Sequence, residues 1–128
     1  MTSAIEEFLR AYAPVTMARE VVKQTQIGGC TFKPGHMVLL SFPAANRDPA
    51  VFPDASRVII DRAQNRHAAF GLGIHRCVGS NLARMEIRIA LTEWLAHFPE
   101  FRLDPDKVLT WSVGTVRGPR QLPLLLYA

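Results

Sequence analysis

Apolar residues at helical spacing mark the beginning of the chain. They recur at intervals of three and four residues, at Ile5, Phe8, Leu9 and Tyr12. This spacing places them on one face of an α-helix. Ser3 and Glu6 have the spacing of a capping box, and Pro14 is a signal for a helix end. The pattern therefore predicts a short helix over residues 3–12.

A longer helix is predicted over residues 79–97, before Pro99. Its apolar residues lie nearly all round the helix, at Leu82, Met85, Ile87, Ile89, Leu91, Trp94 and Leu95. A helix that is apolar on every side is normally covered on several sides. We therefore expect it to be buried on several sides.

Strand-forming runs lie between these two helices, at Val21–Val22 and Met37–Leu40. Pro34 and Gly35 suit the central pair of a type II turn. We therefore predict a hairpin over about residues 30–42. Cys30 lies in this hairpin, and we interpret it as a small packed side chain.

The remaining segments have no helical period. Residues 43–69 are rich in Pro, Asp and Asn, which predicts a long irregular loop. Toward the end of the chain, we predict a strand near Val108–Leu109 and turns at Gly114 and Gly118–Pro119. A last strand is predicted over Leu122–Tyr127.

Composition limits the classes of function. The 128 residues carry a net charge of +4 and are 48% hydrophobic, which indicates one folded unit. No block of Lys and Arg stands out, so nucleic-acid binding is not expected. No membrane span and no secretory signal are expected either. Two cysteines cannot build a disulfide framework, so we expect a reducing, cytoplasmic environment.

The densest group of chemically informative residues lies at positions 70–84. Gly71, Gly73 and Gly79 surround Cys77, and the long predicted helix follows directly. Glycines allow a tight turn and the close approach of a flat ligand. A helix N-terminus favours an anion such as a thiolate, the form of cysteine that binds metals. His75 adds a donor for an anionic group on the same ligand.

This stretch resembles the haem-binding loop of the cytochrome P-450 family, whose pattern F-x-x-G-x-x-x-C-x-G is met by Phe70, Gly73, Cys77 and Gly79. His75 and Leu82–Arg84 match its bacterial extension. The resemblance implies haem b with Cys77 as the axial ligand of the iron, shielded by Phe70. It also implies haem contacts from Gly71 and Gly79 and a propionate contact from His75.

The resemblance extends upstream of the cysteine. Glu7 and Arg10 match the family's E-x-x-R helix, and Arg57 matches the arginine of its irregular meander, which together imply a buried structural triad. By spacing alone, without the resemblance, Glu7 and Arg10 are read first as a surface ion pair that contributes little to stability. Arg19 matches a propionate-binding arginine, and a guanidinium suits a carboxylate. Residues near the substrate are implied at Val15, Thr16, Met17, Val113, Thr115 and Val116.

The implied fold is α+β, mainly α: the C-terminal portion of the family fold, with an E-x-x-R helix, small β-sheet, meander, cysteine loop, long helix and C-terminal β-hairpin. The implied activity is insertion of one oxygen atom from O2 into a small organic substrate. Electrons would come from a ferredoxin, flavodoxin or reductase, which a set of arginines could meet: Arg62, Arg66, Arg76 and Arg88. Alternatively, these arginines are ordinary surface charges that contact only solvent.

Three other interpretations of the motif have weaker support. A dinucleotide fingerprint needs a third glycine where Arg76 stands, and a zinc site needs a second ligand pair beside His75 and Cys77. A nucleophilic cysteine needs a recognisable base.

Residues 1–128 match only the C-terminal third of the family pattern. The distal oxygen-activating helix and the N-terminal helices have no counterpart, so no acid–base residue can be named. By the resemblance, these absent parts would cover the helix after Cys77, so much apolar surface is expected to be exposed there. The alternative to a monooxygenase is therefore a non-catalytic truncated remnant that binds haem weakly or acts as a structural or interaction fragment.

Overall fold

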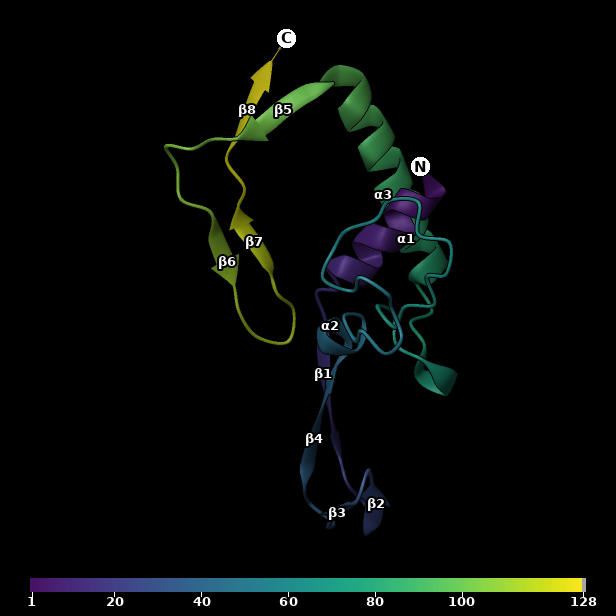
Figure 1. The fold of residues 1–128 in the computed structure, drawn as a ribbon. Helices are drawn as coiled ribbons and strands as arrows, with labels where there is room; N and C mark the ends of the chain where they lie inside the picture. The colour runs from purple at the N-terminus through teal and green to yellow at the C-terminus, as the bar shows by residue number, and fades with distance from the viewer. Residues whose placement is uncertain (128) are drawn as a thin grey trace.

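The computed structural model describes residues 1–127 and contains helices and strands in comparable amounts (Figure 1). The helical segments are α1 (Thr2–Ala11), α2 (Phe42–Ala45), the 3-10 helix η1 (Gly73–His75) and α3 (Ser80–His97). The strands are β1 (Thr16–Glu20), β2 (Thr25–Ile27), β3 (Cys30–Phe32), β4 (Met37–Ser41), β5 (Glu100–Leu103), β6 (Thr110–Ser112), β7 (Gly118–Gln121) and β8 (Leu124–Tyr127). No helix among residues 1–127 is long and apolar enough to cross a membrane.

The first helix forms where its apolar spacing predicts, but its cap differs from the prediction. Met1 is the N-cap and makes no side-chain capping bond, so Ser3 lies inside the helix. The capping-box prediction for Ser3 and Glu6 is therefore wrong. The Glu6 carboxylate instead accepts hydrogen bonds from Arg84 and His67, which approach from distant parts of the chain.

The strands pair differently from the predicted hairpin. The turn at Pro34–Gly35 does form, because the His36 amide donates to the Lys33 carbonyl oxygen at 3.1 Å and Gly35 has a φ of 84°. However, the two strands that it joins do not pair with each other. β4 pairs with β1, and β3 pairs with β2 across a turn at Gly28–Gly29. The predicted pairing over residues 30–42 is therefore wrong.

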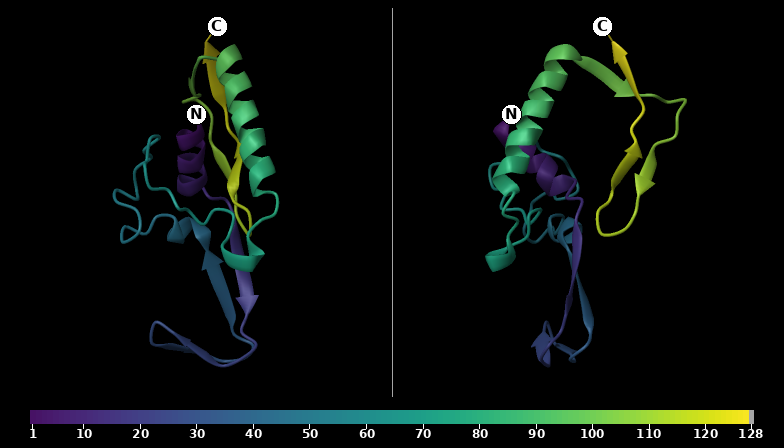
Figure 2. Two further views of the ribbon diagram at one scale, coloured as in Figure 1. Left: turned by 90° about the vertical axis from the view of Figure 1, so that its right-hand side faces the viewer. Right: turned by 180° about the vertical axis from the view of Figure 1, so that it is seen from behind.

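These pairings produce one long arm. β1 and β4 run antiparallel over five residue pairs, from Thr16 opposite Ser41 to Glu20 opposite Met37. The arm projects away from the helices, with β2 and β3 at its far tip (Figure 2). The predicted run Val21–Val22 lies just beyond the end of β1. Cys30 is exposed at the tip of the arm, so the interpretation as a packed side chain is wrong.

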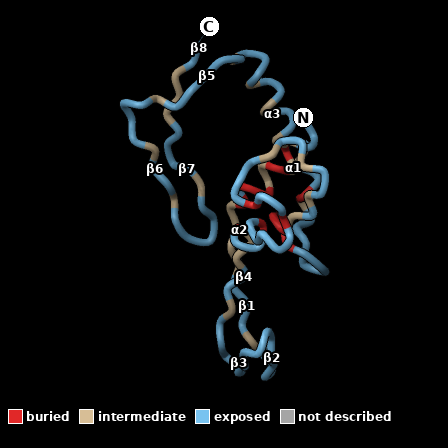
Figure 3. The backbone as a smooth tube through the Cα atoms, viewed as in Figure 1, coloured by how far each residue is buried: buried red, intermediate tan, exposed pale blue. Residues whose placement is uncertain are grey.

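The core lies between α1 and the irregular loop that follows α2. The loop prediction for residues 43–69 is confirmed, apart from the four-residue helix α2 at its start. Buried positions gather in this region (Figure 3). The buried apolar residues are Ile5, Ala11, Ala13, Phe52, Ala55, Ala68 and Ala69, and the buried polar ones are Glu7, Arg10, Asn46 and Ser80.

The long helix α3 has the predicted extent, but its sides are open. Among its residues Ser80 is buried, whereas Leu82, Met85, Ile89 and Leu95 are exposed. Burial on several sides is therefore not what the structure shows, and the expectation of exposed apolar surface is confirmed. The end of the helix turns into β5 through a cluster of aromatic rings, with Trp94 4.8 Å from Phe98 and 5.8 Å from Phe101 between centroids.

The last part of the chain forms two hairpin ladders. β5 pairs with β8, and β6 pairs with β7. The strand predicted near Val108–Leu109 begins instead at Thr110, and the last strand begins at Leu124 rather than Leu122. Gly118–Pro119 lies inside β7 and is not a turn. The α+β class is confirmed.

Candidate functional site

The loop before α3 is shaped by glycines and a single closing hydrogen bond. Gly71 and Gly73 have φ values of 72° and 69°, a region that side chains disfavour. The Cys77 amide donates to the Phe70 carbonyl oxygen at 2.9 Å, which closes the loop across seven residues. The loop thus presents Cys77 immediately before the helix.

Cys77 itself is exposed and free. Gly79 is the N-cap of α3, and the Ser80 amide donates to the Cys77 carbonyl oxygen at 3.3 Å. The thiol therefore lies at the positive end of a long helix, which favours an anion or a metal-bound thiolate. Gly79 has an ordinary φ of −79°, and a Cβ there would lie 3.8 Å from the Cys77 sulfur. Gly79 therefore belongs to the site because it lies next to the Cys77 sulfur, and not because its backbone conformation requires a glycine.

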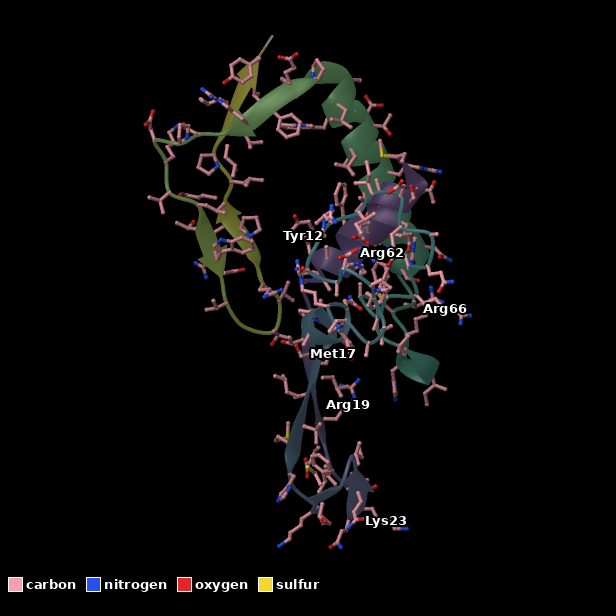
Figure 4. All side chains as sticks on the ribbon, viewed as in Figure 1. Tyr12, Met17, Arg19, Lys23, Arg62 and Arg66 are labelled. Carbon is pink, nitrogen blue, oxygen red and sulfur yellow. The ribbon has the colours of Figure 1, made fainter. Side chains whose placement is uncertain are left out.

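A groove of about 420 Å³ lies between the β1–β4 arm and this loop. Arg19 from β1 and His75 from η1 both line it, 56 positions apart in sequence. The rest of the lining is largely apolar: Met17, Leu39, Leu40, Ser41, Phe42, Ala45, Ala68, Gly71 and Leu72. Figure 4 shows Met17 and Arg19 at neighbouring outward positions along β1. The groove thus combines an apolar wall with two cationic or hydrogen-bonding side chains.

These features fit a flat, apolar group that carries carboxylates and a metal. Cys77 does not line the groove itself, but it follows the lining residue His75 by two positions, and its exposed sulfur would supply a soft ligand. Arg19 and His75 are suited to the carboxylates, and Leu39, Leu40 and Phe42 are suited to the flat apolar body. Of the residues predicted to hold haem, Arg19, Gly71 and His75 thus share one groove, whereas Cys77, Phe70 and Gly79 do not line it.

The Glu7–Arg10 pair lies wholly inside the protein. Both side chains are 0% exposed, with 2.7 Å between Arg10 Nη2 and Glu7 Oε1. Arg10 also donates to the carbonyl oxygens of Asn46, Ala55 and Arg57 at 2.8–2.9 Å. The reading as a surface ion pair is therefore wrong, and the pair holds the irregular loop against α1.

The third member of this network differs from the predicted one. Arg62 Nε lies 3.0 Å from Glu7 Oε2, and the Arg62 side chain is 7% exposed. Arg57, by contrast, has an exposed side chain and contributes its carbonyl oxygen, which accepts from Arg10 and Arg62. The assignment of the Arg57 guanidinium to the triad is thus corrected to Arg62. The loop backbone turns so that position 57 faces outward and position 62 returns to α1.

The network changes the acidity of Glu7. Burial alone raises the pKa of a carboxyl group. Hydrogen bonds from Arg10, the Ile59 amide and Arg62 outweigh burial and lower the pKa of Glu7 from 4.5 to about 2. Glu7 is therefore ionised in the folded protein at neutral pH.

Other residues of this core were not predicted from the sequence. The Asn46 carboxamide oxygen accepts from the Ala68 amide at 2.7 Å, and Asn65 Nδ2 donates to Glu7 Oε2 at 3.0 Å. Arg47 donates to the Ala11 carbonyl oxygen at the end of α1. The run Asn46–Arg47–Asp48–Pro49 was a visible signal, but spacing alone does not show which backbone groups such side chains reach.

The two segments predicted to lie near the substrate meet in the structure. The Thr16 amide donates to the Thr115 carbonyl oxygen at 2.9 Å, and Val15 bridges Val116. Met17 continues from this junction into the groove, and Val113 is exposed in the same connection between β6 and β7. Residues almost a hundred positions apart are thus brought to one place.

The arginines considered for an electron donor divide into two groups. Arg66, Arg76 and Arg88 are exposed. Arg62 belongs to the buried network, so its inclusion in an exposed docking set is wrong. Figure 4 shows this difference, with Arg62 beside α1 and Arg66 at the outer edge of the loop.

Comparison with known proteins places these features in a family context. A family model described as Cytochrome P450 matches residues 1–122. Mycinamicin IV hydroxylase/epoxidase from Micromonospora griseorubida is 43% identical over 129 residues, which cover 96% of this chain and 32% of that protein. The steroid C26-monooxygenase of Mycolicibacterium smegmatis is 38% identical, and the matched region covers 98% of this chain and 32% of that protein.

A solved structure gives the same result for the fold. CYP109E1 from Bacillus megaterium, in complex with testosterone, matches with a TM-score of 0.91 and 37% identity over 98% of this chain and 35% of that one. The chain therefore spans about a third of the length of the curated relatives that it matches.

Proposed function

This chain belongs to the cytochrome P450 family, and we propose that it forms the haem-binding part of a bacterial-type monooxygenase. The observation that carries the proposal is the juxtaposition at the cysteine loop. An exposed thiol stands at a helix N-terminus, and two propionate-binding candidates, Arg19 and His75, line one groove beside the loop. The whole activity also requires the part of the family fold that this chain does not span.

Each residue has a separate task in this proposal. Cys77 binds the iron of haem b, and Arg19 and His75 bind its propionates. Gly71 and Gly79 keep the backbone close to the macrocycle, and Phe70 shields the sulfur. Bound haem with a thiolate ligand supplies the chemistry of O2 activation. Glu7, Arg10 and Arg62 stabilise the loop and take no part in the reaction.

Substrate and electron donor are proposed more broadly. A small organic substrate would lie near the junction of the β1 start with the β6–β7 connection, at Val15, Thr16, Met17, Val113, Thr115 and Val116. Two relatives are named for a steroid and for mycinamicin IV, which supports an organic substrate. A ferredoxin, flavodoxin or reductase would meet the exposed Arg66, Arg76 and Arg88. The free cysteines suit a reducing cytoplasm.

A second candidate function is a haem-free or weakly binding fragment with a structural or interaction role. The exposed apolar residues of α3 and of the β1–β4 arm support it, because such surfaces are normally covered by protein. Met37, Leu39, Leu82 and Ile89 are examples, each at least half exposed.

A spectroscopic experiment separates the two candidates. The purified 128-residue chain is reconstituted with haem, reduced and exposed to carbon monoxide. A red-shifted Soret band that disappears in Cys77→Ser and persists in Cys30→Ser supports a thiolate site, since both cysteines are exposed and free. No haem uptake by the unsubstituted chain, or an unchanged band in Cys77→Ser, contradicts the haem proposal. Oxygenation assays with a surrogate redox partner then test turnover.

A further inference from the structure

A second ion-pair cluster lies on the other side of α1 from the Glu7 network. Glu6 accepts from Arg84 through both carboxylate oxygens, at 2.6 Å from Nε and 2.9 Å from Nη2. His67 Nε2 lies 3.0 Å from the same carboxylate. Because Glu6 is in α1, His67 in the loop and Arg84 in α3, the cluster joins three separate elements. None of these three residues belongs to the site described above.

The Arg84 guanidinium is held in a defined plane. Two of its nitrogens bind Glu6, and its third, Nη1, donates to the Ser80 carbonyl oxygen at 3.1 Å. Its central carbon lies 4.8 Å from the centroid of the Phe70 ring, a cation–π distance. The guanidinium therefore binds Glu6 and Ser80 through its edges and contacts Phe70 with its face. A lysine could supply the charge but not this planar arrangement.

The His67 ring borders Phe70 as well. The two ring centroids are 6.4 Å apart, and the His67 side chain is 2% exposed. His67 Nδ1 accepts from the Ala69 amide at 3.2 Å, so Nε2 carries the proton that is donated to Glu6. Burial lowers the pKa of His67, which agrees with a neutral ring. The ion pair of the cluster is therefore Glu6 with Arg84.

Phe70 is connected directly to the cysteine. Its carbonyl oxygen accepts the hydrogen bond of the Cys77 amide that closes the loop. An element that holds the Phe70 ring consequently also holds this carbonyl, and with it the backbone at Cys77. The path runs from Glu6 to Arg84, from Arg84 to the Phe70 ring, and from the Phe70 carbonyl to Cys77.

We propose that Glu6 and Arg84 are positioning residues for the Cys77 loop that act through the Phe70 ring. His67 supports them by binding the same carboxylate. The cluster fixes the loop before any ligand arrives, so its effect is present in the haem-free chain. The role deepens the proposed function, on which its relevance to haem rests, but the contacts themselves do not need haem.

Amide hydrogen exchange of the haem-free 128-residue chain tests this role. Arg84→Lys is expected to raise the exchange rate of the Cys77 amide about fivefold, a factor typical of one lost cation–π contact. Phe70→Leu is expected to raise it by a similar factor. The double variant should show no further increase, because both substitutions break the same path. Amides of β5 and β8 should be unchanged in all three proteins.

The controls separate positioning from general stabilisation. Glu86→Gln alters an exposed carboxylate of the same helix and should leave Cys77 exchange unchanged. If Arg84→Lys does not fold, Glu6→Gln replaces it, with the same expected result. An unprotected Cys77 amide in the unsubstituted chain, no change in Arg84→Lys, or independent effects of the two substitutions would overturn the proposal. So would faster exchange throughout the molecule, which indicates a merely structural role.

The haem-loaded protein provides an independent reading. Arg84→Lys should reduce the fraction of the reduced carbon monoxide complex that shows the red-shifted band. If the unsubstituted chain binds no haem, the proposed function fails, but the exchange experiment still decides the role of Arg84. If haem binds and exchange at Cys77 is unaffected by Arg84→Lys, the positioning role fails alone.

Discussion

Two regions of the molecule are stabilised in different ways. Here the scaffold means α1 with the irregular loop at residues 46–72, and the open face means the β1–β4 arm, α3 and the C-terminal strands. The scaffold contains most of the buried side chains, including Glu7 and Arg10 at 0% exposure. The open face exposes large apolar side chains on nearly every element, for example Leu39, Ile89 and Trp111. The contrast is visible in Figure 3.

The difference shows how a loop without regular structure is kept in place. Its carbonyl groups cannot all bind one another, so side chains must satisfy them. Arg10 donates to three loop carbonyl oxygens, and Arg47 and Arg62 donate to others. The stability of the scaffold therefore depends on buried charge, whereas the open face depends on local hydrogen bonds and on few buried side chains.

The largest loss of stability is expected for the substitution Arg10→Ala. It removes five hydrogen bonds and leaves Glu7 buried with fewer partners. The cost of breaking a buried pair is about 3–5 kcal/mol, enough to unfold a marginal domain. Urea unfolding followed by circular dichroism measures it. A loss below about 1 kcal/mol would show that the scaffold does not depend on this residue.

The second-largest effect is expected from acid, which should lower the free energy of unfolding through Glu7. Because the pKa of Glu7 is lowered to about 2 in the folded chain, the folded state binds the proton more weakly than the unfolded state. The ionised Glu7 carboxylate therefore contributes about 3 kcal/mol to the free energy of unfolding. This contribution is fully present above pH 4.5 and is lost as pH falls toward 2. Unfolding free energies across this range measure it. In Glu7→Gln, which has no carboxyl group at position 7, this part of the pH dependence should disappear.

A smaller effect distinguishes two loop arginines. Arg62→Ala removes a contact to Glu7 and hydrogen bonds to the carbonyl oxygens of Pro53 and Asp54, and should cost about 1–3 kcal/mol. Arg57→Ala keeps its carbonyl acceptor and should stay within about 0.5 kcal/mol of the unsubstituted chain. Parallel urea unfolding compares the two. A larger loss at Arg57 would restore it as the third member of the triad.

The smallest effect is expected on the open face. Leu82→Gln and Ile89→Gln alter residues of α3 that are 53% exposed, so each should change the free energy of unfolding by less than about 0.5 kcal/mol. Thermal unfolding of both variants measures this. A loss comparable to that of Arg62→Ala would mean that the open face is covered in solution, for instance by another polypeptide.

The sequence by itself determined the features that depend on near neighbours. The spacing of Ile5, Phe8 and Leu9 predicted α1, and the apolar run before Pro99 predicted α3, because helical hydrogen bonds reach only four residues. The cysteine loop was recognisable because its glycines, histidine and cysteine lie within a few positions. The turn at Pro34–Gly35 was likewise local.

The tertiary structure decided everything that needs two distant segments. It placed the guanidinium of Arg62, and not that of Arg57, against Glu7, because the path of the loop determines which side chain lies beside α1. It paired β4 with β1, whereas β3 pairs with β2 across the turn at Gly28–Gly29. It also brought Arg84 onto Phe70 beside Glu6. Spacing along the chain contains no measure of these contacts, because they depend on how the backbone is routed in three dimensions.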